Sequence, residues 1–121
     1  MTSSLPVLDA VALNALRRLP SVGGCHMLSA VADLYFRDAP PLLLQMEAAF
    51  AARDLPALGR AAHALKSYAG NIGATALMIH LKSLEAVAKV EYTVACAALL
   101  PSLQLLFAEA LAELLVEAAA P

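Results

Sequence analysis

The chain has 121 residues, of which 61% are hydrophobic and 15% charged, and its net charge at pH 7 is −2. This length fits a single domain over residues 1–121, and the lack of a basic excess disfavours nucleic-acid binding as the main role. The longest stretch without a charged residue, Tyr92 to Ala108, contains Pro101 and polar residues and is barely long enough to cross a bilayer. No basic region precedes the first apolar residues, as a secretory signal would require. We therefore expect a cytoplasmic protein without membrane insertion.

Ala and Leu, both strong helix formers, make up much of the hydrophobic fraction, whereas β-branched and aromatic residues are sparse. This composition predicts an all-α fold. Asp9 is placed to cap a first short helix that ends at Arg18. A turn over residues 21–24 then separates it from a second helix over roughly residues 25–37.

Proline and glycine divide the rest of the chain into longer helices. Asp38 predicts the start of a third helix, because two prolines follow it and are tolerated only in a first turn. Asp54 and Pro56 give a similar start signal for a fourth helix, which Gly70-Asn71 closes or bends. A fifth helix follows from Gly73-Ala74 to about Val90.

The last helix lies between Thr93 and Ala118, and Pro101 predicts either a kink in it or a later start. Its apolar stripe comprises Leu103, Phe107, Leu111, Leu114 and Leu115. Helices of this length with short connections predict an antiparallel up-down four-helix bundle, built from the third to the last helix, with one or two additional short N-terminal helices.

The fourth helix has two contrasting faces. Its apolar residues step by four and three positions and form one buried stripe, which comprises Leu58, Ala62, Leu65, Ala69 and Ile72. His63 lies roughly 160° from Leu65 around the helix axis and therefore points to solvent. Its neighbours on that face are Gly59, Lys66, Ser67 and Gly70.

Small residues are unusual on an exposed helix face, because Gly in a helix interior costs about 1 kcal/mol relative to Ala. We infer that Gly59 and Gly70 keep the face flat so that another protein can approach the imidazole of His63 closely. The alternative is that both are helix-packing or helix-terminating glycines. Lys66, and more weakly the hydroxyl of Ser67, could then bind a phosphoryl group on the ring.

The remaining cysteine and histidine residues indicate no metal site. Cys25 and Cys96 are isolated in sequence, and we expect both to be reduced and buried as small hydrophobic residues. We expect His80 to be a half-buried packing residue and His26 to be a surface residue. The chain also lacks a Gly-rich phosphate loop and an acidic cluster for Mg²⁺, so a partner would have to bring the metal.

The segment Ala62–Ala74, which contains His63 and Lys66, resembles the signature of histidine-containing phosphotransfer (Hpt) domains of two-component phosphorelays. The family motif has a His, any residue, Leu, Lys and a small residue, and then Asn-Ile/Leu-Gly-Ala a few positions later. Together with Leu84-Glu85, further matching segments extend the resemblance to roughly residues 8–117.

The resemblance implies that His63 accepts a phosphoryl group from the aspartyl phosphate of a receiver domain and passes it to another receiver. It places Lys66 beside the phosphohistidine. This chain has Ser67 at a position where the family usually has Gly. The chain would be a phosphoryl carrier without a catalytic site or cofactor of its own, with Mg²⁺ held by the receiver. Its partners would be receiver domains, possibly those of a hybrid sensor kinase, and we expect a monomer.

The family binds receivers largely through apolar contacts around the histidine. The third helix carries more apolar residues than one buried stripe needs, and from these and the fourth helix we predict docking residues: Leu42, Leu43, Met46 and Ala64. An alternative function is a helical adaptor that binds a receiver or another regulator without being phosphorylated. A bundle that binds a metal or haem ranks last, because it needs inward-facing ligands and His63 faces outward.

Overall fold

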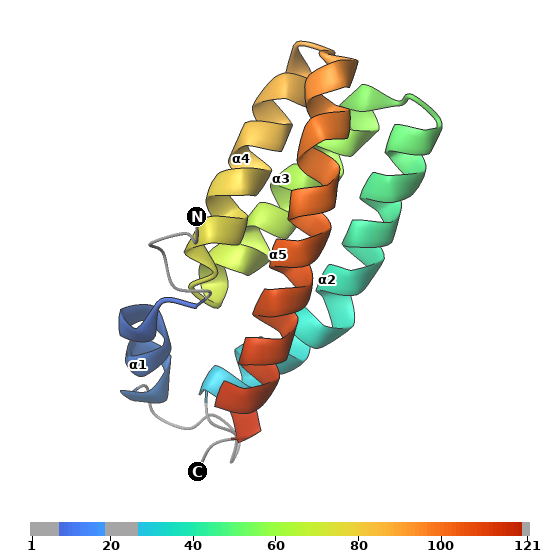
Figure 1. Ribbon diagram of the computed structural model, residues 1–121. Coiled ribbons are helices and arrows are strands. Elements are labelled where there is room, and N and C mark those ends of the chain that lie inside the picture. Colours follow the sequence, from blue (N-terminus) through green and yellow to red (C-terminus); the bar gives the residue numbers. More distant parts are fainter. Residues whose placement is uncertain (1–7, 19–26, 120–121) are drawn as a thin grey trace.

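The computed structural model describes residues 8–18 and 27–119, and every regular element in these ranges is a helix (Figure 1). The elements are α1 (Ala10–Arg18), α2 (Met27–Ala51), α3 (Leu55–Asn71), α4 (Thr75–Lys89) and α5 (Thr93–Ala119). Helices α2 to α5 run alternately up and down, and α1 lies at one end of the bundle. The prediction of an all-α four-helix bundle with a short additional N-terminal helix is confirmed.

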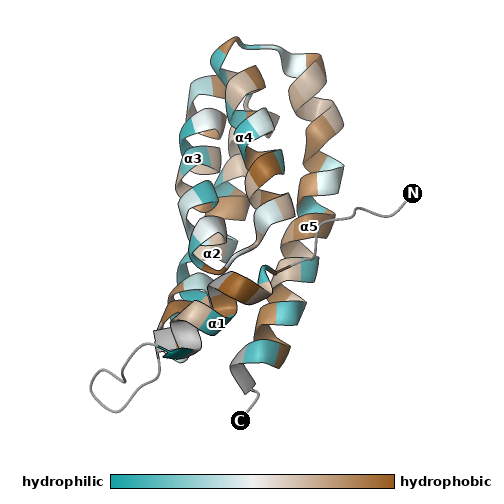
Figure 2. Cartoon of the chain, turned by 90° about the vertical axis from the view of Figure 1, so that its left-hand side faces the viewer, coloured by the Kyte–Doolittle hydropathy of each residue, from teal (hydrophilic) through white to brown (hydrophobic). Residues whose placement is uncertain are grey.

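The interior of the bundle is apolar. Apart from the Tyr35 hydroxyl, which is buried without a hydrogen-bond partner, no polar or charged side-chain group among the described residues is buried. The hydrophilic positions of the four long helices lie on their outer faces (Figure 2). The predicted stripe of α3 is fully buried at all five positions: Leu58, Ala62, Leu65, Ala69 and Ile72. Burial of such side chains contributes about 1.5–3 kcal/mol for each large one, so this stripe fixes the rotation of α3 about its axis.

The predicted boundary between the second and third helices was wrong. Both form one helix, α2, which continues through Pro40 and Pro41 although proline removes a backbone donor and crowds the preceding turn. Figure 1 shows that the start of α2 runs in a different direction from the rest. The helix persists because Tyr35, Ala39 and Met46 are fully buried on one face, and tertiary packing outweighs the local preference.

Asp38 lies within α2 and therefore does not cap a helix. Its carboxylate forms a salt bridge with Arg37 at 3.0 Å and accepts a hydrogen bond from the Tyr68 hydroxyl at 3.1 Å. The hydrogen bond from the Arg37 guanidinium is the largest of the effects that lower the pKa of Asp38. The contact with Tyr68 connects α2 to α3.

The capping role predicted for Asp9 is confirmed, since its Oδ1 accepts a hydrogen bond from the Val11 amide at 2.9 Å. The Asp9 amide donates to the Gly73 carbonyl at 2.6 Å, which ties the start of α1 to the α3–α4 turn. The turn predicted over residues 21–24 lies outside the described residues, as do Cys25 and His26.

Helix α5 begins at Thr93 and contains Pro101 in its interior, so the proline does not start the helix. The predicted stripe is buried or half-buried at four positions, but Leu115 is 55% exposed and was wrongly assigned to the core. Cys96 is fully buried, as expected. By length and composition α5 is apolar enough to cross a membrane. In the bundle it packs against α4 and α2.

Three helix ends close in the same way, with a left-handed residue after the last turn. At the end of α2 the Asp54 amide donates to the Ala49 carbonyl at 2.8 Å, and the left-handed residue is Arg53, with a φ of 58°. At the end of α3 the Ala74 amide donates to the Ala69 carbonyl at 2.9 Å, and Gly73 has a φ of 72°. At the end of α4 the Tyr92 amide donates to the Val87 carbonyl at 2.9 Å, and the left-handed residue is Glu91, with a φ of 56°. Only glycine adopts this conformation without steric cost.

We predict that Glu91→Gly stabilises the protein, by up to about 1 kcal/mol, because the left-handed conformation costs a side-chain-bearing residue about 1–2 kcal/mol and glycine loses part of that gain through its unfolded-state entropy. Gly73→Ala is the reciprocal control and should destabilise by about 1 kcal/mol or more. Urea unfolding followed by circular dichroism measures both. A destabilised Glu91→Gly variant would contradict the assigned turn geometry.

Candidate functional site

The tight turn between α3 and α4 decides which residues of the two helices face each other. The helices are antiparallel, and the turn is centred near Ala74. His63 lies eleven residues before Ala74 and Glu85 eleven residues after it, so the hairpin brings them to the same level. The short turn and the buried stripes on both helices leave no freedom to shift this register.

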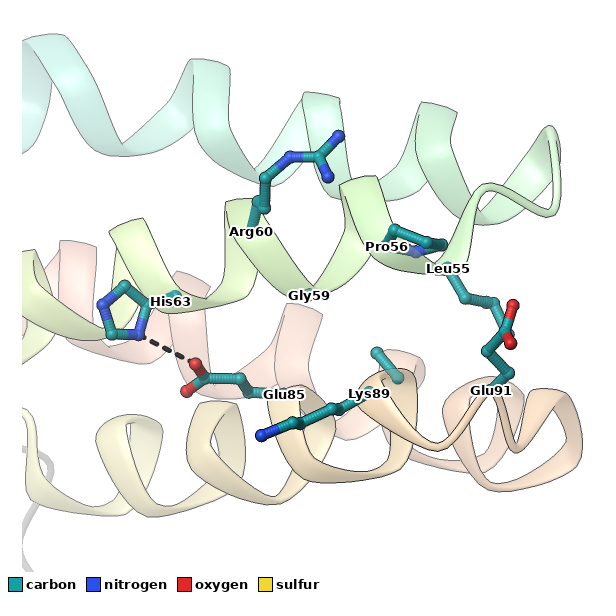
Figure 3. Close-up of a pocket in the computed structure, with 9 residues that line it drawn as sticks. Leu55, Pro56, Gly59, Arg60, His63, Glu85, Lys89 and Glu91 are labelled. Atoms are coloured by element: carbon teal, nitrogen blue, oxygen red, sulfur yellow. Dashed lines mark hydrogen bonds and ion pairs between the residues drawn. The ribbon is translucent and has the colours of Figure 1, made fainter.

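His63 is exposed, as the helical periodicity predicts, and 63% of its side chain is accessible to solvent. Its Nδ1 atom lies 2.8 Å from Oε2 of Glu85. An ionised carboxylate can only accept hydrogen bonds, so in the neutral imidazole the hydrogen is on Nδ1 and Nε2 carries a lone pair. Figure 3 shows the second ring nitrogen pointing away from Glu85 and α4. A free lone pair directed outward is the requirement for a nucleophile that another protein must reach.

Glu85 also accepts a hydrogen bond from Lys66, with Nζ at 2.6 Å from Oε1. The pKa of Glu85 is lowered from its usual value of 4.5, mainly by this bond and, after opposing desolvation, by the contact with His63. The carboxylate is therefore ionised at neutral pH. Lys66 is 26% exposed, and its charge is directed to Glu85 rather than to open solvent.

The sequence interpretation included Glu85 in the family resemblance but gave it no role. Periodicity relates residues along one helix, whereas this contact joins two helices and depends on the hairpin register. The signal available in the sequence is the equal spacing of His63 and Glu85 from the Gly73-Ala74 turn.

A groove runs beside His63 between α3 and α4, with a volume of about 620 Å³ (Figure 3). Its lining residues come from the start of α3, the end of α4 and the turn that follows α4: Leu55, Pro56, Gly59, Arg60, His63, Glu85, Ala88, Lys89 and Glu91. A methyl group at Gly59 would lie 3.6 Å from Cβ of Ala88, an ordinary contact distance. Helix packing thus tolerates alanine at Gly59, and the added methyl group would fill part of the groove.

The other residues predicted around His63 are distributed along α3. Ser67 and Gly70 are exposed on the turns that follow His63. A methyl group at Gly70 would lie 3.4 Å from Sδ of Met78, which is at the near limit of ordinary contact. His80 is half-buried and donates from Nε2 to the Leu99 carbonyl at 2.8 Å, which agrees with the packing role expected for it.

One predicted docking residue was wrong. Met46 is fully buried in the core, because it shares the inward stripe of α2 with Tyr35 and Ala39, and no partner can reach it. Leu42, Leu43 and Ala64 are half-buried. Two of them, Leu42 and Ala64, lie in a second groove between α2 and α3, whose lining residues are Leu42, Gln45, Ala48, Ala57, Arg60, Ala61 and Ala64. Their role in docking stays a prediction.

Comparison with known proteins gives two matches that agree with this site. A family model described as Hpt domain matches residues 30–118. The crystal structure of histidine-containing phosphotransfer protein B (HptB) from Pseudomonas aeruginosa PAO1 is similar, with a TM-score of 0.84 and 28% sequence identity, and the match covers 95% of this chain and 96% of that chain. No curated protein sequence matches. Both matches span the helices that hold His63 and Glu85.

We predict that Glu85→Gln reduces the loss of stability on acidification. The folded-state pKa of Glu85 lies below its usual value of 4.5, so its stabilising contribution is complete above that value and is lost as the pH falls through the folded pKa. Glutamine cannot titrate, so the variant should lack the contribution of Glu85 to the difference in the free energy of unfolding between pH 6 and pH 3. Urea unfolding at each pH measures this difference. Glu113→Gln, at an exposed position of α5, is the matched control and should keep the wild-type difference. Equal curves for Glu85→Gln and wild type would contradict the assignment.

Proposed function

Because the chain belongs to the Hpt domain family and has a phosphotransfer role in two-component signalling, we propose that His63 is the residue that carries the phosphoryl group. It accepts the group from the aspartyl phosphate of one receiver domain and passes it to another. The observation that carries this proposal is the arrangement of the exposed imidazole: Nδ1 contacts Glu85, and Nε2 points away from Glu85 and α4 (Figure 3).

In the proposed transfer, the Nε2 lone pair of His63 attacks the phosphorus atom in line with the aspartyl oxygen. The new P–N bond forms as the P–O bond breaks, and the aspartate leaves with the electron pair as a carboxylate. The ring keeps its hydrogen on Nδ1 and becomes positively charged. Glu85, 2.8 Å away, stabilises that charge and keeps the ring oriented, and the reverse sequence delivers the group to the next receiver.

Lys66 has a different role from a simple phosphate ligand. A phosphoryl group brings negative charge close to Glu85, and two anions side by side would repel each other. The ammonium group of Lys66, 2.6 Å from Glu85, offsets this repulsion. We infer that it balances the charge of the site in both the free and the phosphorylated state, with the Ser67 hydroxyl as a second donor toward the phosphoryl group.

The chain acts in this proposal as a carrier, and the receiver supplies Mg²⁺ and the groups that activate the phosphoryl transfer. Among the described residues no three His, Cys, Asp or Glu side chains are grouped to hold a metal ion. We place the protein in the cytoplasm. In this proposal α5 is a helix of the bundle and does not enter a membrane. The receiver docks on α3 and the adjacent part of α2, on a surface that includes Leu42, Leu43 and Ala64.

His63→Gln should abolish phosphorylation by a phosphorylated receiver, because the amide has no nucleophilic lone pair comparable with that of imidazole. Wild type should give an acid-labile, base-stable phosphoprotein, detected with radiolabelled phosphate. His80→Gln makes the same change at a half-buried histidine of α4 and should leave labelling intact. Labelling of His63→Gln at the wild-type level would refute the proposal. Equal binding of a receiver to wild type and His63→Gln, with no phosphoryl transfer to either, would instead support the adaptor function.

Gly59→Ala should separate docking from chemistry. Alanine should stabilise α3 by about 1 kcal/mol, and its methyl group should slow transfer from a receiver at least about tenfold by obstructing the groove beside His63. Phosphorylation by phosphoramidate, a small donor that needs no docking surface, should keep its wild-type rate. An unchanged rate of transfer from the receiver would mean that Gly59 is dispensable for docking.

A further inference from the structure

The outward side of α5 carries a stripe of uncharged apolar residues. Nine exposed residues lie within a sector of about 100° around the helix axis, and they are Val94, Ala97, Ala98, Pro101, Leu105, Ala108, Ala112, Leu115 and Val116. The four largest side chains of this α5 stripe are between 55% and 71% exposed. An exposed apolar surface of this length, about 33 Å, is unusual for a protein that functions alone.

The α5 stripe is separate from the site that contains His63. Helix α5 packs against α4 and α2, whereas α3 packs between α2 and α4 on the other side of the bundle. The stripe faces away from these neighbours, since its residues are exposed in the folded chain. A partner on α5 therefore leaves the face of α3 open to a receiver.

The charges of α5 restrict how a partner can lie on this face. The helix contains no Lys or Arg, and its acidic residues, Glu109, Glu113 and Glu117, all lie in the C-terminal half. Figure 2 shows the hydrophilic turns of α5 concentrated toward the C-terminus. In a parallel pair of α5 helices the carboxylates of the two copies would lie side by side. In an antiparallel pair the carboxylates of each copy lie beside the uncharged N-terminal half of the other copy's α5.

Five of the nine residues of the α5 stripe are placed symmetrically about Leu105. Val94 lies eleven residues before Leu105 and Val116 eleven residues after it. Ala98 and Ala112 lie seven residues before and after it, and these small side chains allow two helix backbones to approach closely. An antiparallel pair therefore sets valine against valine at both ends and leucine against leucine at the centre.

From this complementarity we propose that the α5 stripe binds a second copy of the chain, with the two α5 helices antiparallel and a twofold axis at Leu105. This replaces the monomer expected from the sequence. The dimer presents two copies of His63 on opposite outer faces. It is independent of the phosphoryl chemistry, so its failure would leave the function of His63 intact.

The first test is sedimentation velocity on the full chain over a range of concentrations. We expect wild type to approach twice the 12.6 kDa mass of one chain. Leu105→Glu should weaken the dimer at least about tenfold, because it loses apolar burial and faces its own charge across the twofold axis. Leu44→Glu is the matched control: Leu44 is 66% exposed on α2, outside the stripe, and the variant should dimerise like wild type. Circular dichroism verifies that both variants fold.

The second test determines the direction of pairing. Val94→Lys combined with Val116→Glu places opposite charges together in an antiparallel dimer and like charges together in a parallel one. Val94→Glu combined with Val116→Glu places like charges together in both. We therefore expect the first double variant to dimerise and the second to be monomeric.

Three results would overturn the proposal. One is a wild-type chain that stays monomeric up to millimolar concentration. Another is a Leu105→Glu variant that dimerises as strongly as wild type. The third is a monomeric chain that floats with phosphatidylglycerol vesicles and loses this binding in Leu105→Glu, since a lipid surface would then be the partner of the stripe.

Discussion

The register of the α3–α4 hairpin is the constraint on which the functional part of this structure depends. Two buried stripes fix the rotation of the helices, and the closed turn at Gly73 fixes their offset along the bundle. Only in this register does Glu85 lie opposite His63. The orientation of the imidazole is thus determined by packing and turn geometry away from the ring, and a one-residue slip in the turn would rotate Glu85 by about 100° away from it.

Glu85 determines which nitrogen of the His63 ring is free. The carboxylate of Glu85 accepts hydrogen bonds from both His63 and Lys66. The bond from His63 determines which ring nitrogen is free, and the charge of Lys66 neutralises the carboxylate. The orientation of the His63 ring and the position of its hydrogen are therefore set before any partner binds. A solvent-exposed histidine without such a neighbour would exchange its hydrogen between the two nitrogens and would rotate.

Most of the fold could be predicted from the sequence, because its capping residues and apolar periodicity agree with the final packing. The boundaries at Asp54 and Gly73 are confirmed, but the break expected at Pro40 is absent, since burial of the surrounding stripe outweighs the local cost of proline. The exposed orientation of His63 also followed from periodicity. Glu85 and Leu115 could not be assigned in the same way: the first acts through a contact between helices, and the second depends on which side of α5 the bundle covers.

The short separation of His63 and Glu85 along the chain, 22 residues, has a consequence for how the protein folds. Joining two points this close in sequence costs little chain entropy, and a hairpin of two helices can form on a timescale near that of helix formation itself. The hairpin packs mainly against its immediate neighbours in sequence, so the whole domain has the local topology of rapidly folding proteins. The contact that orients the His63 ring is therefore local in the chain, and its geometry depends on the α3–α4 hairpin rather than on the distant N-terminal segments.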